Sequence, residues 1–304
     1  MASSSKKVIY AALTGNFLIA VTKFVAAFIT GSSAMLSEGI HSTVDTGNQL
    51  LILLGLKKAA KPADKEYPFG HGKEVYFWSF VVAIMIFAVG AGISIYEGIN
   101  SLMNPHPFDN PIMNYIVIGL AMIFEGVAWY YALREFRRTK GNRGYYEAIH
   151  KAKNPTTFVV LFEDSAAMLG LVIAFLGIAI GQWTGLYLFD GIASILIGMI
   201  LGVTAAWLAY ETKGLLIGES ADPQIVRGIK DIASSHKAIE KVNEILTMHM
   251  GPEFILLNLS VDFQDTYSAN DIEDSTQNIT REIKSRFPRI KRIFIEAENK
   301  SMYI

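Results

Sequence analysis

The chain lacks cysteine entirely and carries little charge. The absence of cysteine from all 304 residues excludes disulfide bridges and thiolate metal sites, and it leaves the compartment open. Charged residues make up 18% of the chain, below the roughly 25% of an average soluble domain. The formal net charge of −1 indicates no class of partner by itself, and no nucleic-acid partner is expected. A composition this poor in charge argues against a wholly soluble protein.

What the chain does have is long apolar runs. Hydrophobic residues make up 51% of it, and the mean hydropathy is +0.32. Several runs reach the length of about 20 residues that a helix needs to span a bilayer. Six such runs cover approximately residues 8–29, 34–56, 75–102, 112–135, 157–181 and 186–211. We therefore expect an all-α membrane domain of six transmembrane helices at residues 1–212, followed by a soluble domain at residues 213–304.

Basic residues are distributed unevenly between the connecting loops. The loop between the second and third runs carries five lysines, and the loop between the fourth and fifth carries six basic residues, whereas loops 103–111 and 182–185 carry none. Because positively charged loops stay on the cytoplasmic side, both termini are expected in the cytoplasm. The opening "MASSSKK" leads directly into a long run, which indicates a retained first helix. We expect a multi-pass protein of the bacterial cytoplasmic (inner) membrane.

The last part of the chain has the pattern of a small α+β domain. Asp222 followed by Pro223 predicts the start of one helix, and Ser268 predicts the cap of another at about 270–287. Between the helices two strands flank a Gly-Pro turn, and a third strand follows. The order αββαβ predicts a two-layer, ferredoxin-like cytoplasmic domain suited to regulation or dimerisation. The sequence has no Gly-rich phosphate loop, nucleophile elbow or catalytic triad, so we expect neither an enzyme nor a catalytic residue.

The second apolar run holds a polar stripe. In "SEGIHSTVDTGNQLLILLGL", residues 37–56, the spacing places Glu38, His41, Asp45 and Asn48 on one face of a helix. Counting about 1.5 Å per residue from the outer end, His41 lies roughly 10 Å deep and Asp45 roughly 16 Å deep in a hydrocarbon core about 30 Å thick. Ionisable residues are expensive at that depth, so these are candidates for function.

Two other runs bring carboxylates to a similar height. Glu163 and Asp164 lie roughly 10 Å from the inner face, and Glu125 falls near mid-membrane as a secondary candidate for metal binding or proton coupling. A His and an Asp at i, i+4 can reach one ion, and a carboxylate from a second helix adds a third ligand. This donor set suits zinc, iron, cobalt or manganese. The alternative is a set of unrelated buried hydrogen bonds.

Three further charged residues within the runs are expected to be structural. Lys23 and Glu97 fall toward the outer ends of their runs, where a long side chain can snorkel to the interface or face a vestibule. Asp190 lies just inside the start of the last run, where the helix dipole favours a carboxylate.

Over nearly its whole length the sequence resembles the cation diffusion facilitator family of metal–proton antiporters. The resemblance rests on "GNFLIAVTKFVAAFITGSSAMLSEGIHSTVDTGNQ", on "YPFGHGKE" and on "HMGPEFILLNLSVDF". Within the family the chain looks most like the animal zinc-transporter-9 type. The resemblance implies a homodimer in a lipid bilayer that exports a divalent metal in exchange for protons. Zinc is the first candidate substrate, Mn²⁺, Fe²⁺ and Co²⁺ are the others, and no prosthetic group is implied.

In the family, the transport site is built from two i, i+4 pairs, one on the second span and one on the fifth. His41 and Asp45 match the first pair, and Asp164 matches the aspartate of the second. Val160 stands where a His or Asp is usual, so the site lacks one ligand. Glu163, about 100° round the helix from Asp164, is the favoured replacement. The glutamate of the fourth span and water are the other candidates.

Two secondary sites of the family look eroded. In the loop before the third span Asp64 and His71 remain, but Tyr67 replaces the middle ligand. The Asp64–His71 pair is therefore a candidate for secondary metal binding or proton coupling, with a tight turn as the alternative. A binuclear zinc clamp in the C-terminal domain is not expected. The positions of its usual ligands hold Asn243, Asn258, Glu296 and Glu298.

Three classes of function remain open from the sequence. The residues favour a secondary transporter that works by alternating access, and proton coupling follows because ligands must be deprotonated to bind metal. A metal-dependent membrane enzyme of the di-iron type needs many clustered histidines, and the chain has six in all. A non-transporting partner or sensor would have kept the fold after losing the ligand at Val160, and it would bind another protein through its soluble domain.

Overall fold

The computed structural model describes residues 2–105, 107, 111–140, 144 and 155–299, and for residues 2–15, 111, 139 and 155–157 only the backbone is described. The predicted loop residues Arg143, Lys151 and Lys153 lie outside the described residues. The chain divides into two compact units, one formed by Met1–Leu56 and Phe77–Thr212 and the other by Lys57–Tyr76 and Lys213–Ile304.

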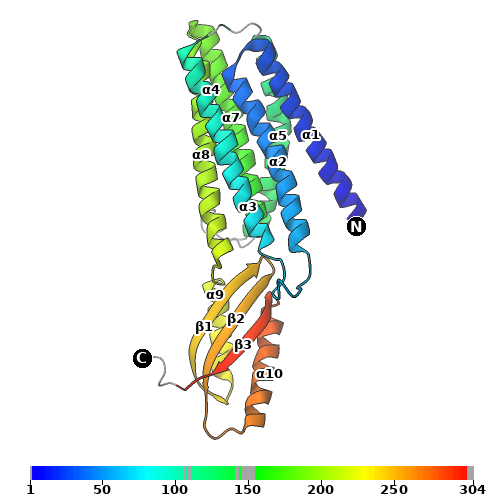
Figure 1. The fold of residues 1–304 in the computed structure, drawn as a ribbon, viewed down its shortest axis with the longest axis vertical. Helices are drawn as coiled ribbons and strands as arrows, with labels where there is room; N and C mark the ends of the chain where they lie inside the picture. Colours follow the sequence, from blue (N-terminus) through cyan, green and yellow to red (C-terminus); the bar gives the residue numbers. More distant parts are fainter. Residues whose placement is uncertain (1, 106, 108–110, 141–143, 145–154, 300–304) are drawn as a thin grey trace. The chain divides into compact units, whose positions relative to one another are not determined.

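The first unit is a bundle of long helices (Figure 1). A π-helical turn, η1, lies within one continuous helical stretch, Glu74–Met103. The elements are α1 (Ala2–Thr30), α2 (Ser33–Ala59), α3 (Glu74–Met85), η1 (Ile86–Ala91), α4 (Gly92–Met103), α5 (Pro111–Lys140), α7 (Pro155–Thr184) and α8 (Leu188–Ile217).

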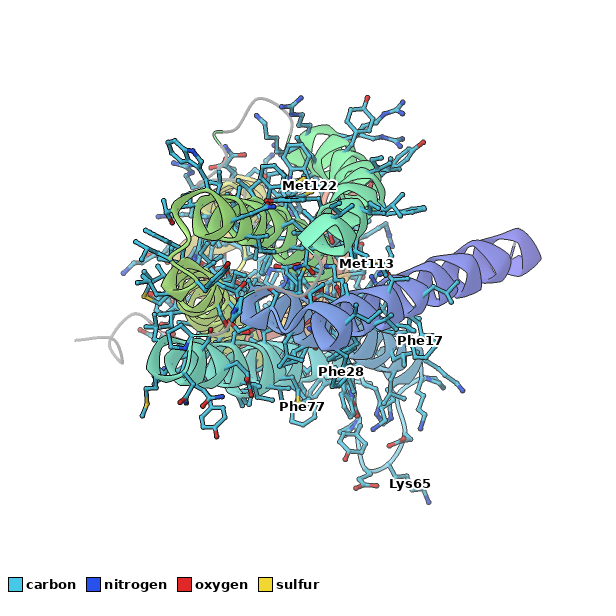
Figure 2. All side chains as sticks on the ribbon, turned by 90° about the horizontal axis from the view of Figure 1, so that it is seen from above. Phe17, Phe28, Lys65, Phe77, Met113 and Met122 are labelled. Carbon is cyan, nitrogen blue, oxygen red and sulfur yellow. The ribbon has the colours of Figure 1, made fainter. Side chains whose placement is uncertain are left out.

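The composition of these helices identifies a membrane protein. Four are long and apolar enough to cross a bilayer, namely Glu74–Met103, Ile112–Arg138, Phe158–Thr184 and Leu188–Ile217. The apolar stretch of α1 with described side chains, Asn16–Thr30, is shorter, and α2 carries the polar stripe. Phe28 is 83% exposed and Phe17 is 58% exposed. Figure 2, a view along the bundle, shows side chains projecting outward around it. Apolar side chains left outside in this way suit a lipid environment. The count of six spans remains a prediction.

Small residues let α4 and α8 approach closely. A Cβ placed on Gly98 would lie 2.8 Å from the carbonyl oxygen of Gly191 and 2.6 Å from Cγ1 of Ile195. A Cβ on Gly198 would lie 3.0 Å from the backbone nitrogen of Ile95. Helices in membranes commonly associate through such small-residue contacts, because there van der Waals packing replaces the hydrophobic effect as the driving force.

The second unit contains a mixed three-stranded sheet with two helices. Strand β1 (Ile239–Gly251) pairs antiparallel with β2 (Phe254–Phe263), and β2 pairs parallel with β3 (Ile290–Ala297). Helices α9 (Pro223–Ser235) and α10 (Ala269–Arg286) complete the predicted αββαβ order (Figure 1). One face of the sheet and both helices share a hydrophobic core, which includes Ile229, Ile232, Ile255, Leu257, Leu259, Val261, Ile279 and Ile283.

Both predicted helix caps of this unit are confirmed. The Asp222 side chain accepts a hydrogen bond from the backbone N–H of Gln224 at 2.8 Å, and Pro223 opens α9. Ser268 and Asp271 form a reciprocal capping box at the start of α10. Each cap satisfies backbone N–H groups that have no partner within their own helix.

Candidate metal centre

The polar stripe of α2 faces the interior of the first unit. Glu38, His41, Asp45 and Asn48 are 0%, 1%, 8% and 1% exposed. The i, i+3 and i, i+4 spacing that predicted a shared face is therefore confirmed by burial. Because unpaired charges are costly in hydrocarbon, the contacts of these side chains decide what the stripe can do.

His41 and Asp45 lie side by side one helical turn apart. Nε2 of His41 is 3.4 Å from Oδ2 of Asp45. Both ring nitrogens of His41 and Oδ1 of Asp45 are buried and have no hydrogen-bond partner among the described residues. Buried polar atoms are almost always satisfied in native proteins, so unsatisfied donors and acceptors of this kind mark a place for a ligand. An imidazole and a carboxylate together suit a divalent transition metal.

Helix α7 presents Glu163 to α2. Glu163 is 4% exposed, and its Oε1 accepts a hydrogen bond of 2.6 Å from Nδ2 of Asn48. The carboxyl groups of Glu163 and Asp45 are also within hydrogen-bonding reach of each other. Asp164 is only partly buried and interacts electrostatically with Glu163 and Glu125, and Val160 packs against the hydrophobic core.

The predicted ligand set is therefore brought together only in part. The structure joins His41 to Asp45 and Asp45 to Glu163. Within the described part of the chain, no three His, Cys, Asp or Glu side chains converge closely enough to hold a metal ion. The four-ligand site of His41, Asp45, Asp164 and Glu163 remains a prediction. Closing it requires a shift of α7 or of its side chains.

Lys23 does not snorkel to the interface, which was one of the two placements expected for it. Its side chain is fully buried, and Nζ donates to Oε2 of Glu38 at 3.0 Å and to Oγ of Ser42 at 2.7 Å. Oε1 of Glu125 lies 4.0 Å away. Apart from Lys23, no residue of α1 indicates this network; it is indicated by Glu38 on the α2 stripe, an acidic residue that needs a buried countercharge.

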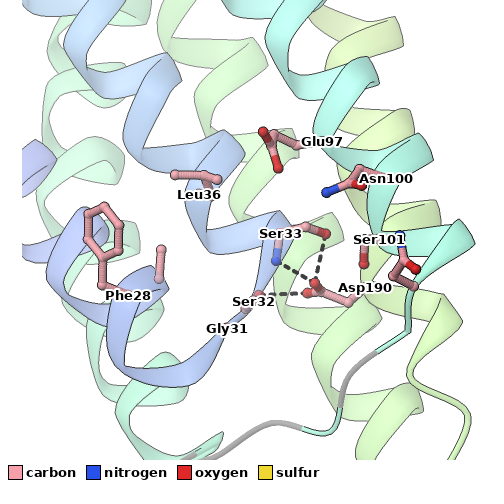
Figure 3. Close-up of a pocket in the computed structure, with 11 residues that line it drawn as sticks. Phe28, Gly31, Ser32, Ser33, Leu36, Glu97, Asn100, Ser101 and Asp190 are labelled. Carbon is pink, nitrogen blue, oxygen red and sulfur yellow. Dashed lines mark hydrogen bonds between the residues drawn. The ribbon is translucent and has the colours of Figure 1, made fainter.

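Asp190 lies in the first turn of α8, as expected, and it also contacts the start of α2. Its carboxylate accepts hydrogen bonds from the hydroxyl of Ser32 at 2.6 Å and from the hydroxyl and backbone N–H of Ser33 (Figure 3). It thereby caps the N-terminus of α2, where the helix dipole favours negative charge. A cavity of about 170 Å³ adjoins this cap and is also lined by Glu97. Since Ser33 precedes His41 by eight residues, the cavity lies roughly 12 Å along α2 from His41.

The Asp64–His71 pair organises a loop of the second unit. Nε2 of His71 lies 3.0 Å from Oδ2 of Asp64, and Oδ1 of Asp64 accepts from the backbone N–H groups of Glu66 and Tyr67. The Tyr67 ring packs against the His71 ring, with centroids 4.5 Å apart. These hydrogen bonds, that from His71 foremost, lower the pKa of Asp64 below its usual value. The contacts fit the tight-turn alternative, and a secondary metal role for the pair remains a prediction.

The residues at the family's C-terminal zinc positions hydrogen-bond to one another across the sheet. Nδ2 of Asn243 donates to the backbone carbonyl of Glu298 at 3.0 Å, and Nδ2 of Asn258 donates to Oε1 of Glu296 at 3.0 Å. The hydroxyl of Ser260 donates to Oε2 of Glu298. These bonds join β1 and β2 to β3 and to Glu298, which directly follows the end of β3.

Comparison with known proteins identifies the family. The family model described as the cation efflux transmembrane domain matches residues 9–217. The mitochondrial proton-coupled zinc antiporter SLC30A9 of Mus musculus is 33% identical over 259 residues, which cover 84% of this chain and 46% of that protein. The manganese efflux system protein MneP of Bacillus subtilis is 23% identical over 297 residues, which cover 96% of this chain and 95% of that protein.

The chain thus spans about half the length of the SLC30A9 relatives that it matches, and most of the length of the bacterial one. The matched region runs from within α1 to the end of α8 and includes every residue of the α2 stripe. On these matches, the chain belongs to the cation diffusion facilitator, or cation efflux, family, with a clear similarity to its SLC30A9 members.

Proposed function

We propose that this chain is a secondary transporter that moves a divalent transition-metal ion across a membrane in exchange for protons, by alternating access. Family membership supports transport of a metal cation. The observation that carries the proposal is the buried His41–Asp45 pair on α2, with unsatisfied ring nitrogens, facing the carboxylate of Glu163 on α7. A site shared between two helices can be opened to either side by movement of one helix against the other.

Zinc is the first candidate substrate and manganese the second. The relatives named above are a zinc antiporter and a manganese efflux protein, so both metals are candidate substrates. One imidazole with two or three carboxylates is a harder donor set than two imidazoles, because oxygen ligands replace nitrogen. We therefore expect this site to discriminate less strongly against manganese, iron and cobalt than a site with two histidines.

Proton exchange follows from the same ligands. The imidazole of His41 and the carboxyl groups of Asp45 and Glu163 must each lose any bound proton before they can bind a metal ion. Metal and protons then compete for one set of atoms. Alternating exposure of such a site to the two sides of a membrane couples their movements in opposite directions.

The deciding experiment is flux in reconstituted vesicles. We expect zinc added outside wild-type vesicles to drive proton movement in the opposite direction, and Asp45→Ala or His41→Ala to abolish both fluxes while leaving a folded, monodisperse protein. Zinc, manganese, iron and cobalt are compared with and without a pH gradient. The exposed Lys65→Ala serves as a control for handling and should retain wild-type flux. Full flux in either stripe variant would place the site elsewhere.

One observation favours the alternative function, a non-transporting sensor or partner. Val160 occupies the position of a family ligand, and within the described residues no three candidate ligands converge. A sensor of this kind would bind metal without carrying it. The same vesicles separate the two functions, because a sensor would show zinc binding but no metal-driven proton flux.

We also propose an oligomeric state, an orientation and a membrane for the transporter. We propose a homodimer in a lipid bilayer, with six spans and with both termini on the cytoplasmic side because the basic loops lie there. The bacterial cytoplasmic membrane is the proposed location, and the SLC30A9 relatives are named as mitochondrial. Protease access in sealed vesicles of known orientation tests the placement of the C-terminal unit.

A further inference from the structure

Asn48 joins the polar stripe of α2 to α7. Its side chain is 1% exposed, and Nδ2 donates to Oε1 of Glu163 at 2.6 Å, a short distance for an amide donor. Glu163 itself is 4% exposed. A hydrogen bond to a charged acceptor in so dry a setting is stronger than one at the surface, because water does not compete for either group.

The bond fixes where the Glu163 carboxylate lies. Asn48 follows Asp45 by three residues, so both side chains stand on the same face of α2 about one turn apart. Glu163 reaches both of them, through the amide of Asn48 and beside the carboxyl of Asp45. Two carboxylates placed this close repel each other in a medium of low dielectric. The N–H donor of Asn48 offsets that repulsion by engaging Oε1 of Glu163.

We propose that Asn48 is a positioning residue of the transport site: it holds the Glu163 carboxylate over the His41–Asp45 face and so supplies the ligand that is missing at Val160. This inference rests on the proposed function. A glutamate has three rotatable side-chain bonds, and fixing them before the metal arrives removes part of the entropy that binding would otherwise lose. Partners that orient a ligand in this way typically change metal affinity by about 10–100-fold when they are removed.

The test exchanges donor and acceptor without changing the net charge. Asn48→Leu removes the donor while keeping the number and branching of the side-chain heavy atoms, and Glu163→Gln removes the ligand charge. The double variant Asn48→Asp/Glu163→Gln puts the carboxylate on α2 and the amide on α7. Asn114→Leu is the matched control, because Asn114 is another fully buried amide of the bundle, held by the hydroxyl of Thr30 at 2.8 Å. Zinc and manganese dissociation constants are measured on the monodisperse full-length protein in detergent, together with KM and maximal flux in vesicles.

We expect Asn48→Leu and Glu163→Gln each to weaken zinc binding at least tenfold and to raise KM more than they lower maximal flux. The double variant should recover to within about threefold of wild type, because it restores one amide–carboxylate bond beside Asp45. Asn114→Leu should leave the dissociation constant of the folded protein unchanged. An Asn48→Leu protein that folds and binds zinc as wild type does, or a double variant that binds zinc no more tightly than Glu163→Gln, would overturn the inference. Absence of flux in the wild type would count against the proposed transport function alone, since the binding measurements would still decide the role of Asn48.

Discussion

Lys23 introduces a positive charge into the interior of the helical bundle with no exposed surface. Such a charge is tolerated because three oxygens from two helices surround it, those of Glu38 and Ser42 on α2 and of Glu125 on α5. The network ties α1 to the helix that carries the candidate metal ligands. Its energetic value depends on both partners being present, because either charge alone would be buried without compensation.

Removing only Lys23 should therefore destabilise the protein more than removing the pair. We expect Lys23→Met to lower stability by about 3–5 kcal/mol, as is typical when one partner of a buried ion pair is deleted. Lys23→Met/Glu38→Gln should recover most of that loss, because the buried carboxylate that bonds directly to Lys23 is removed with it and only the more distant Glu125, 4.0 Å from Nζ, loses a countercharge. Thermal unfolding in detergent measures both.

Lys58→Met is the comparison for the Lys23 variants. Lys58 and Glu74 form a partly exposed pair at 3.9 Å, and pairs of that kind contribute only about 0–1 kcal/mol. A double variant no more stable than Lys23→Met would contradict the assignment of this pair as the main contact.

The α2 stripe was predictable residue by residue, whereas the face of α7 was not. Positions separated by three and four residues fix which side chains of one helix share a face, so Glu38, His41, Asp45 and Asn48 were correctly grouped. Whether Glu163 or Asp164 meets that stripe depends on the rotation of α7 about its own axis. That helix is apolar nearly all round, so its sequence contains no amphipathic pattern to fix the rotation.

At the level of elements, local chemistry predicted the helices and strands of the second unit well. The capping residues Asp222 and Ser268 mark helix starts because their side chains bond to backbone groups only two or three residues away, so the sequence alone indicates them. The π-turn of η1 had no such signal. There the backbone N–H of Gly92 bonds to the carbonyl of Phe87, five residues back, within an unbroken apolar run. Packing between helices selects such a turn, and packing is not visible in one segment's pattern.

The close approach of α4 and α8 can be tested with two Gly→Ala variants, one at the contact and one away from it as a control. Gly98→Ala places a methyl group 2.8 Å from the Gly191 carbonyl oxygen, so the helices must separate or bend. We expect a loss of about 1–3 kcal/mol, the usual range for overpacking. Gly119→Ala, in α5, adds the same methyl where no heavy atom lies within 4 Å. It should be neutral or slightly stabilising, because Ala favours helix over Gly.

Thermal unfolding and the monodisperse fraction in detergent compare the two glycine variants directly. Equal stability of Gly98→Ala and Gly119→Ala would show that α4 and α8 do not pack as closely in solution as they do here.

At the scale of the whole molecule, the second unit exposes large apolar side chains on one face of its sheet, on either side of Asn258. Leu246 of β1 pairs with Asn258 of β2, which pairs in turn with Phe294 of β3. Leu246 is 53% exposed, Phe294 42% and the neighbouring Met248 37%. The opposite face, with Leu257 and Leu259, is fully buried against α9 and α10. Exposed apolar patches framed by polar residues are typical of protein–protein contacts, which supports a role for this unit in the proposed homodimer.

We expect the full chain to be a dimer in detergent at micromolar concentration, associated at least partly through residues 221–304. Leu246→Asp should shift it toward monomer, because a carboxylate in a dry contact is left without a partner. Lys230→Asp, at an exposed position on α9, is the control and should leave the dimer intact. A chelator that removes zinc should not dissociate the wild type, because the positions of the family's C-terminal zinc ligands hold Asn243, Asn258 and two glutamates that already bond to neighbouring groups. Light scattering of each sample measures the mass of the protein component. A monomeric wild type, or a dimer that separates on chelation, would show that this unit does not hold two chains together in the way proposed.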